Sequence, residues 1–264
     1  MRDFSLDMLR ELLAAFTAEG FEFVRFEDYW ADRDRYDGRN RTVLYRHDVD
    51  RFPGTALATA KVETELGIVG TYFFRVKPHT FDERVMRDIA DLGHEIGYHY
   101  ENLADAGGDF NRARVLFEEC LSRLRTVYPV VSASMHSRAL SKWDNRRFWD
   151  EFSLDEFGLG GETYRSIDHI KYMYLADSGR DWNADRNVIW DTVDGAQPPR
   201  MEKGTRGLIA EISTHRRIGS AQLLIHPNRW PGSFGGYLAQ TAMDTMINFA
   251  KTLIKTLRRP GGKR

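Results

Sequence analysis

The chain has 264 residues, of which 42% are hydrophobic, and a formal net charge of -1. This length and composition predict a single domain, residues 1–264, with a well-buried α/β core. The near-zero charge predicts no overall attraction to nucleic acid or to membranes, and the single cysteine excludes an internal disulfide. The sequence shows no leader-like start and no run near the ~20 apolar residues of a transmembrane helix, so we expect a cytoplasmic protein.

Helices and strands are predicted to alternate along the chain. Ser5 is expected to cap a first helix that ends near Glu19, and the basic stretch 258–264 is expected to be a solvated tail. Further helices are predicted at 53–66, 81–92, 111–128 and 237–257, and strands at 42–48, 70–76, 95–99, 130–135, 173–176, 188–192, 208–212 and 222–226. This alternation implies a parallel sheet, which binds ligands at the carboxyl ends of its strands.

The strand predicted at 42–48 runs into one histidine and two acids. Side chains alternate between the faces of a strand, so Asp48 and Asp50 point to one side and could meet at one metal ion or one substrate atom. His47 points to the opposite face, for which we expect a structural role.

Further chemistry-bearing residues follow other predicted strands. His99, His136, Asp177 and His226 each lie at or just beyond a strand end. Since the carboxyl ends of parallel strands share one edge of the sheet, these residues are expected to join Asp48 and Asp50 in an active site.

An aspartate with two neutral imidazoles is a common protein ligand set for a catalytic divalent metal. Asp50, His99 and His136 are the three ligands we predict. Such a metal lowers the pKa of bound water toward ~7 and can polarise a carbonyl oxygen, which predicts hydrolysis. The ligand set favours Zn²⁺, while Mn²⁺, Fe²⁺, Co²⁺ and Ni²⁺ suit similar ligands.

Hydrolysis also needs a base and an acid beside the metal. Asp48 is predicted to be the base, with Arg138 keeping it ionised. His226 is predicted to be the acid, protonated and oriented by Asp177.

Three further residues are assigned to substrate binding. Glu101 can contact substrate or cap the turn that follows it, and Trp182 can stack on a sugar ring or simply pack in the core. Arg229, close after His226, is the third.

Five segments together resemble the polysaccharide deacetylase superfamily (NodB homology, carbohydrate esterase family 4-like), in a divergent branch with a His-Asp-Val-Asp first motif. These segments are 47–50, 70–74, 93–99, 177–182 and 223–227, and the resemblance spans about 44–230. It implies a distorted (β/α) barrel of about seven parallel strands with a core at about 42–232, an added N-terminal helix and a long C-terminal helix. It also implies metal-dependent deacylation.

Two departures from the family pattern leave alternatives open. The family places a second metal-binding histidine four residues after the first, where this chain has Leu103. We hypothesise that His136 replaces that ligand and that Arg138 keeps the role of a family arginine. The acid pair is also spaced differently, and a shifted alignment makes Asp48 the ligand and places His47 near the base position.

The predicted function is removal of an N-acyl group, acetyl or formyl, from a sugar or glycan, including a lipid-linked one. The resemblance places this reaction in the biosynthesis of cell-surface polysaccharide or lipopolysaccharide O-antigen. One alternative is an amidohydrolase of a small non-sugar amide, because the same groups fit any planar acyl bond. Another is a catalytically inactive carbohydrate-binding homologue, suggested by the missing histidine. The oligomeric state is left open.

Overall fold

The computed structural model describes residues 2–138, 141–182, 193, 204–214 and 218–258, with 247–258 described by their backbone. The predicted strand 188–192 lies outside the described residues.

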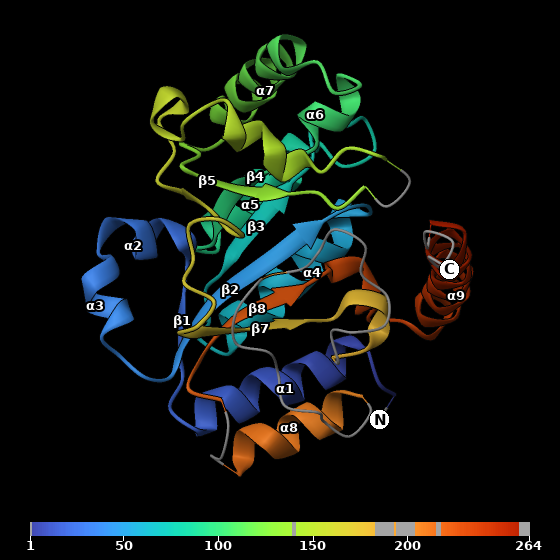
Figure 1. Ribbon diagram of the computed structural model, residues 1–264. Helices are drawn as coiled ribbons and strands as arrows, with labels where there is room; N and C mark the ends of the chain where they lie inside the picture. The colour runs from blue at the N-terminus through green and yellow to red at the C-terminus, as the bar shows by residue number, and fades with distance from the viewer. Residues whose placement is uncertain (1, 139–140, 183–192, 194–203, 215–217, 259–264) are drawn as a thin grey trace, which may run out of the picture.

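A parallel sheet is the centre of the fold (Figure 1). Seven strands follow one another in the order β6-β5-β4-β3-β2-β8-β7, and β1 pairs with the first part of β2. They form a curled half-barrel surrounded by helices, which confirms the predicted distorted (β/α) barrel. The strands are β1 (Glu22–Val24), β2 (Thr42–Val49), β3 (Thr71–Phe74), β4 (Glu95–Tyr100), β5 (Ser132–Met135), β6 (Gly161–Glu162), β7 (Tyr172–Ala176) and β8 (Ser220–Ile225).

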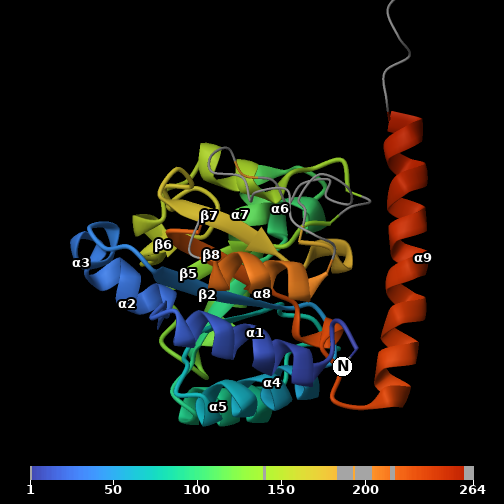
Figure 2. The ribbon, with the colours of Figure 1, turned by 90° about the horizontal axis from the view of Figure 1, so that it is seen from below.

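Helices cover the outside of the curled sheet. α1 and α8 lie side by side along β7 and β8, whereas α6 and α7 lie beyond β5 (Figure 1). The long helix α9 stands beside the body of the molecule (Figure 2). The helices are α1 (Leu6–Ala18), α2 (Phe26–Ala31), α3 (Arg33–Asp37), α4 (Pro53–Glu65), α5 (Glu83–Asp91), α6 (Asn102–Asp105), α7 (Phe110–Arg125), α8 (Thr205–Ser213) and α9 (Phe234–Arg258), with 3-10 turns η1 (Asn145–Asp150), η2 (Asp155–Phe157), η3 (Ser178–Arg180) and η4 (Pro227–Arg229).

One predicted strand, 208–212, is wrong, because these residues belong to α8. Leu208 and Ile212 are both buried at helical i, i+4 spacing, and α8 packs against α1. In a short apolar run, the periods of a strand and of a buried helix cannot be separated. The short elements β1, β6, α2, α3 and α6 were also not predicted.

Strand register brings the chemistry-bearing segments to one edge of the sheet. His47 on β2 is aligned with Ile225 on β8, and His99 on β4 with Ser134 on β5. The residues that follow these strands, including Asp50, His136 and His226, therefore leave the sheet at its carboxyl edge. Gly97 permits the close packing of β3 and β4 below them, because a Cβ there would lie 2.5 Å from the ring of Phe73.

Candidate active site

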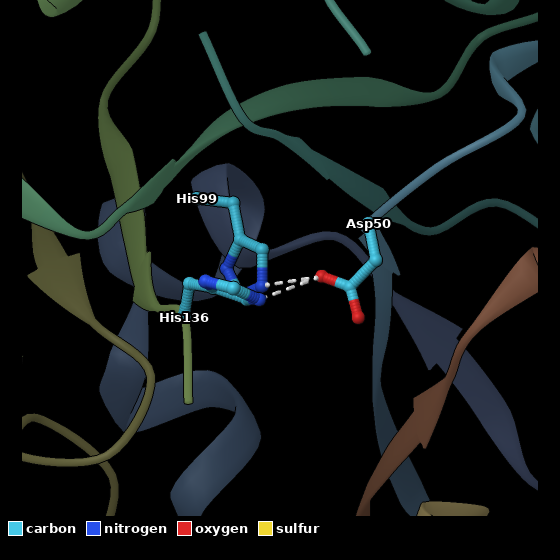
Figure 3. Close-up of side chains that lie close together, drawn as sticks. All are labelled: Asp50, His99 and His136. Atoms are coloured by element: carbon cyan, nitrogen blue, oxygen red, sulfur yellow. Dashed lines mark ion pairs between the residues drawn. The ribbon is translucent and has the colours of Figure 1, made fainter. Parts of the chain in front are cut away.

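Asp50, His99 and His136 converge on one point at the carboxyl edge of the sheet (Figure 3). The Nε2 atoms of His99 and His136 each lie 3.4 Å from Oδ1 of Asp50. One ligand atom from each residue lies within 4.8 Å of the other two. The residues come from three different strand ends, as the sequence predicted for a metal site.

The two imidazoles have their Nδ1 atoms occupied by protein groups. Nδ1 of His99 donates to the carbonyl oxygen of Ser134 at 3.0 Å, and Nδ1 of His136 donates to Oε2 of Glu101 at 3.0 Å. An Nδ1 that donates carries the proton, which leaves the Nε2 of a neutral ring with a free lone pair. Such outer hydrogen bonds orient histidines that bind metals.

The donor set fits a divalent cation. Oδ1 of Asp50 is buried and has no hydrogen-bond partner among the described residues. Burial alone raises the pKa of Asp50, but the facing His136, together with His99 and His226, holds this pKa well below its usual value. Burial also lowers the pKa of His136, which favours the neutral ligand form. One carboxylate and two neutral imidazoles are suited to Zn²⁺ and related ions.

Asp48 lies beside this cluster in a bidentate pair with Arg46. Nε and Nη2 of Arg46 donate to the two carboxylate oxygens at 2.8 and 2.7 Å. Arg46 is 0% exposed, donates to the hydroxyl of Tyr164 at 2.9 Å and stacks over that ring. Oδ2 of Asp48 lies 3.4 Å from Nε2 of His99. Asp48 thus faces the cluster with a cation fixed behind it.

Arg138 has a different partner from the one expected. It donates to Oδ1 of Asp105 at 2.8 Å, and its side chain is 47% exposed. The contact with Asp48 that we expected of Arg138 is made by Arg46, which lies on the same strand face two residues earlier.

His226 faces the cluster from β8. Its Nε2 lies 3.9 Å from Oδ2 of Asp50, and its Nδ1 donates to Oδ1 of Asp177 at 2.5 Å. Asp177 also accepts from the backbone N–H of His226, from Arg229 and from the indole of Trp230. Burial raises the pKa of Asp177, but His226 and Arg229 hold it below the usual value. Asp177 is thus an ionised carboxylate that orients His226.

The residues assigned to substrate binding all have protein partners. Glu101 accepts from His136 and, at 2.7 Å, from Arg75. Arg229 donates to the backbone and the carboxylate oxygen of Asp177. Trp182 is 1% exposed and stacks on Phe4 in the core. Glu101 and Arg229 thus hold other site residues and Trp182 packs in the core, while contact of these three residues with substrate stays a prediction.

Arg46 and Arg75 are site residues that the sequence did not reveal as such. Arg46 shares a strand face with Asp48, a signal that was available. Arg75 on the segment after β3 donates to Glu101 and to the backbone oxygen of Asp50. Its role depends on the packing of β3 between β2 and β4, which the local sequence does not specify.

Comparison with known proteins finds similarity among solved structures. Neither the family models nor the curated proteins compared with the chain include a match. Among solved structures, a family 4 carbohydrate esterase from Bacillus anthracis is similar over 79% of this chain and 76% of its own, with 13% identity and a TM-score of 0.39. It bears the name of the family that the sequence motifs resemble.

Proposed function

We propose that this protein is a divalent-metal-dependent hydrolase that removes an N-acyl group, acetyl or formyl, from a sugar. One observation supports this proposal most strongly: Asp50, His99 and His136 converge on one point. Two pairs lie beside them, Arg46–Asp48 and His226–Asp177. A metal site alone fits many roles. The added base-like and acid-like groups beside it favour hydrolysis of an acyl bond.

Asp50, His99 and His136 would hold the metal, for which Zn²⁺ is our first choice. When bound, the metal supplies a Lewis acid for the acyl carbonyl and lowers the pKa of a water molecule toward ~7. Asp50 is preferred over Asp48 as the ligand, because both oxygens of Asp48 already accept hydrogen bonds from Arg46.

Asp48 accepts the proton of the attacking water. The guanidinium of Arg46 favours the ionised carboxylate that this step requires and fixes its orientation. His226 donates a proton to the departing amine from Nε2, while its Nδ1 stays bound to Asp177. The two groups reach the centre from β2 and β8, which are adjacent strands.

The substrate and its setting follow from the family resemblance of the motifs. We propose an N-acylated sugar or glycan, lipid-linked or polymeric, used in cytoplasmic steps of cell-surface polysaccharide or lipopolysaccharide O-antigen biosynthesis.

The direct test measures acetate and formate released from a panel of N-acyl sugars by the full chain, with and without added Zn²⁺. We expect release that a chelator abolishes and that Zn²⁺ restores. Replacing the base by Asp48→Asn, or the acid by His226→Gln, should lower turnover by about 10²–10⁴-fold with bound metal retained. The exposed variant Arg138→Gln is the control and should stay near wild-type activity. Full activity of Asp48→Asn, or release of ammonia from small amides without any sugar deacylation, would overturn the proposal.

A further inference from the structure

α9 exposes an apolar ridge along its outer side. Phe234, Leu238, Ala242 and Met246 recur every four residues, and all four are exposed, with 55%, 53% and 67% of Phe234, Leu238 and Met246 accessible. Residues spaced by four lie above one another on a helix, so they form a continuous row. Large exposed side chains are common singly, but a row on one helix marks an interaction surface.

The opposite side of α9 explains how the helix is held. Gln240 and Asp244 are buried and bonded to each other, and Thr241 accepts a hydrogen bond from Arg180. The guanidinium of Arg51 contacts the sulfur of Met243. The polar side of this segment thus faces the protein, which is the reverse of an ordinary surface helix. The apolar ridge faces away from the protein except at Phe234, whose ring lies 4.1 Å from the guanidinium of Arg2.

The sequence after Asp244 continues the pattern and adds positive charge. Apolar residues recur at helical spacing through Phe249, Leu253 and Leu257. Residues 245–264 contain six Lys or Arg and no acid, so residues 1–244 carry a net charge of -7. An amphipathic helix with basic residues on its polar side is typical of segments that lie in the surface of an anionic membrane. Among the described helices, none combines the length and the apolar character needed to cross a bilayer.

We propose that α9 docks this protein on an anionic membrane surface, with the apolar ridge inserted at the headgroup boundary and the basic residues near lipid phosphates. A second copy of the chain is the less favoured occupant, because residues 245–264 of both copies are basic and contain no acid. The position of α9 beside the candidate active site also supports membrane docking. It packs on η4, which directly follows His226, and it contacts Arg51, which directly follows Asp50. Docking through α9 would therefore bring the candidate active site to the membrane surface.

The test is co-sedimentation of the full chain with vesicles, measured without substrate. We compare phosphatidylcholine vesicles with vesicles that also contain phosphatidylglycerol, at low and high salt. We expect binding to the anionic vesicles only, weakened by salt. The double variant Leu238→Glu with Met246→Glu should reduce the vesicle partition coefficient by about tenfold or more, because it places charge in the apolar ridge. Lys251→Glu with Lys255→Glu should have a similar effect.

Matched control variants make the same kinds of substitution on the body of the protein, away from α9. Ile170→Glu alters an exposed apolar residue on the body, at 80% accessibility, and should leave vesicle binding unchanged. Arg87→Glu with Arg147→Glu reverses two exposed charges on the body and matches the lysine double variant. A wild-type chain that binds no vesicle, or controls that lose as much binding as the α9 variants, would overturn the proposal. A dimer that the ridge variants convert to a monomer, without lipid binding, would assign the ridge to a second copy instead. Neither outcome depends on the hydrolase assay, so the two proposals fail separately.

Discussion

The two faces of β2 carry two buried histidine–carboxylate clusters that differ in what their histidines can still bind. On one face, Asp48 and the neighbouring Asp50 meet His99, whose Nε2 points to a shared centre. On the other face, His47 bonds to Thr71 through Nδ1 and to Glu63 through Nε2, at 3.2 and 2.7 Å. Both nitrogens of His47 have protein partners, so this cluster has no free ligand atom on that ring.

His94 belongs to the same cluster as His47, and both of its ring nitrogens also face protein atoms. Its Nδ1 accepts from the backbone N–H of Gly70, and its Nε2 faces the carbonyl oxygen of Ala60. Burial lowers the pKa of His94, in keeping with a neutral ring whose two nitrogens serve the fold. A histidine is therefore a candidate ligand when one nitrogen is anchored and the other faces further ligand atoms, and burial beside a carboxylate does not suffice.

We expect the largest effect on stability from removing Glu63, the carboxylate of the second cluster. Glu63 is buried, accepts from Tyr72 at 2.6 Å and pairs with His47. Glu63→Gln removes a buried carboxylate that bonds to both Tyr72 and His47, so we expect the free energy of unfolding to fall by about 1 to 3 kcal/mol. Denaturant unfolding measures this change, and elemental analysis should show unchanged metal in the folded protein. Loss of metal in a folded Glu63→Gln protein would contradict the structural role of this cluster.

Glu101 allows a smaller, matched change in the first cluster. It orients His136 through Nδ1 and is itself held by Arg75. Glu101→Ala is expected to weaken metal affinity by about 10–100-fold, as for other carboxylates that orient histidine ligands. Glu101→Gln should retain more affinity, because its amide oxygen can still accept from His136. Competition with a chelator gives both values, and equal affinity of Glu101→Ala and wild type would exclude the orienting role.

Glu95 is a buried carboxylate that, unlike Asp48 and Asp177, has no cationic partner among the described residues. Burial, and the nearby charge of Glu27, raise the pKa of Glu95 to about 7. Between the unfolded value near 4.5 and this folded value, the folded state binds more protons than the unfolded state, so stability falls as pH rises. We expect Glu95→Gln to raise the free energy of unfolding at pH values above the folded pKa by about 1 to 2 kcal/mol and to flatten its pH dependence. An unchanged slope of stability against pH in Glu95→Gln would refute this account.

Much of the fold and the metal-facing residues could be predicted from the sequence, since long periodic helices and polar strand ends leave local patterns. The pattern at Asp48 and Asp50 identified the shared strand face, and strand ends identified His99 and His136. The partner of Asp48 was mistaken because Arg46 lies within an apolar-looking strand, whereas Arg138 lies in a loop. The burial of Trp182 and the pairing of Arg229 with Asp177 depend on contacts between distant segments, which local sequence does not encode.

We propose that His99 and His136 both bind the metal through Nε2. X-ray absorption spectroscopy of the Zn²⁺-loaded full chain reports the number of imidazoles and their distance from the ion. We predict two imidazoles and oxygen ligands at ~2.0 to 2.2 Å in the wild-type chain. His136→Ala should leave one imidazole, while His94→Ala should leave two. Two imidazoles in folded His136→Ala would contradict the proposed ligand set.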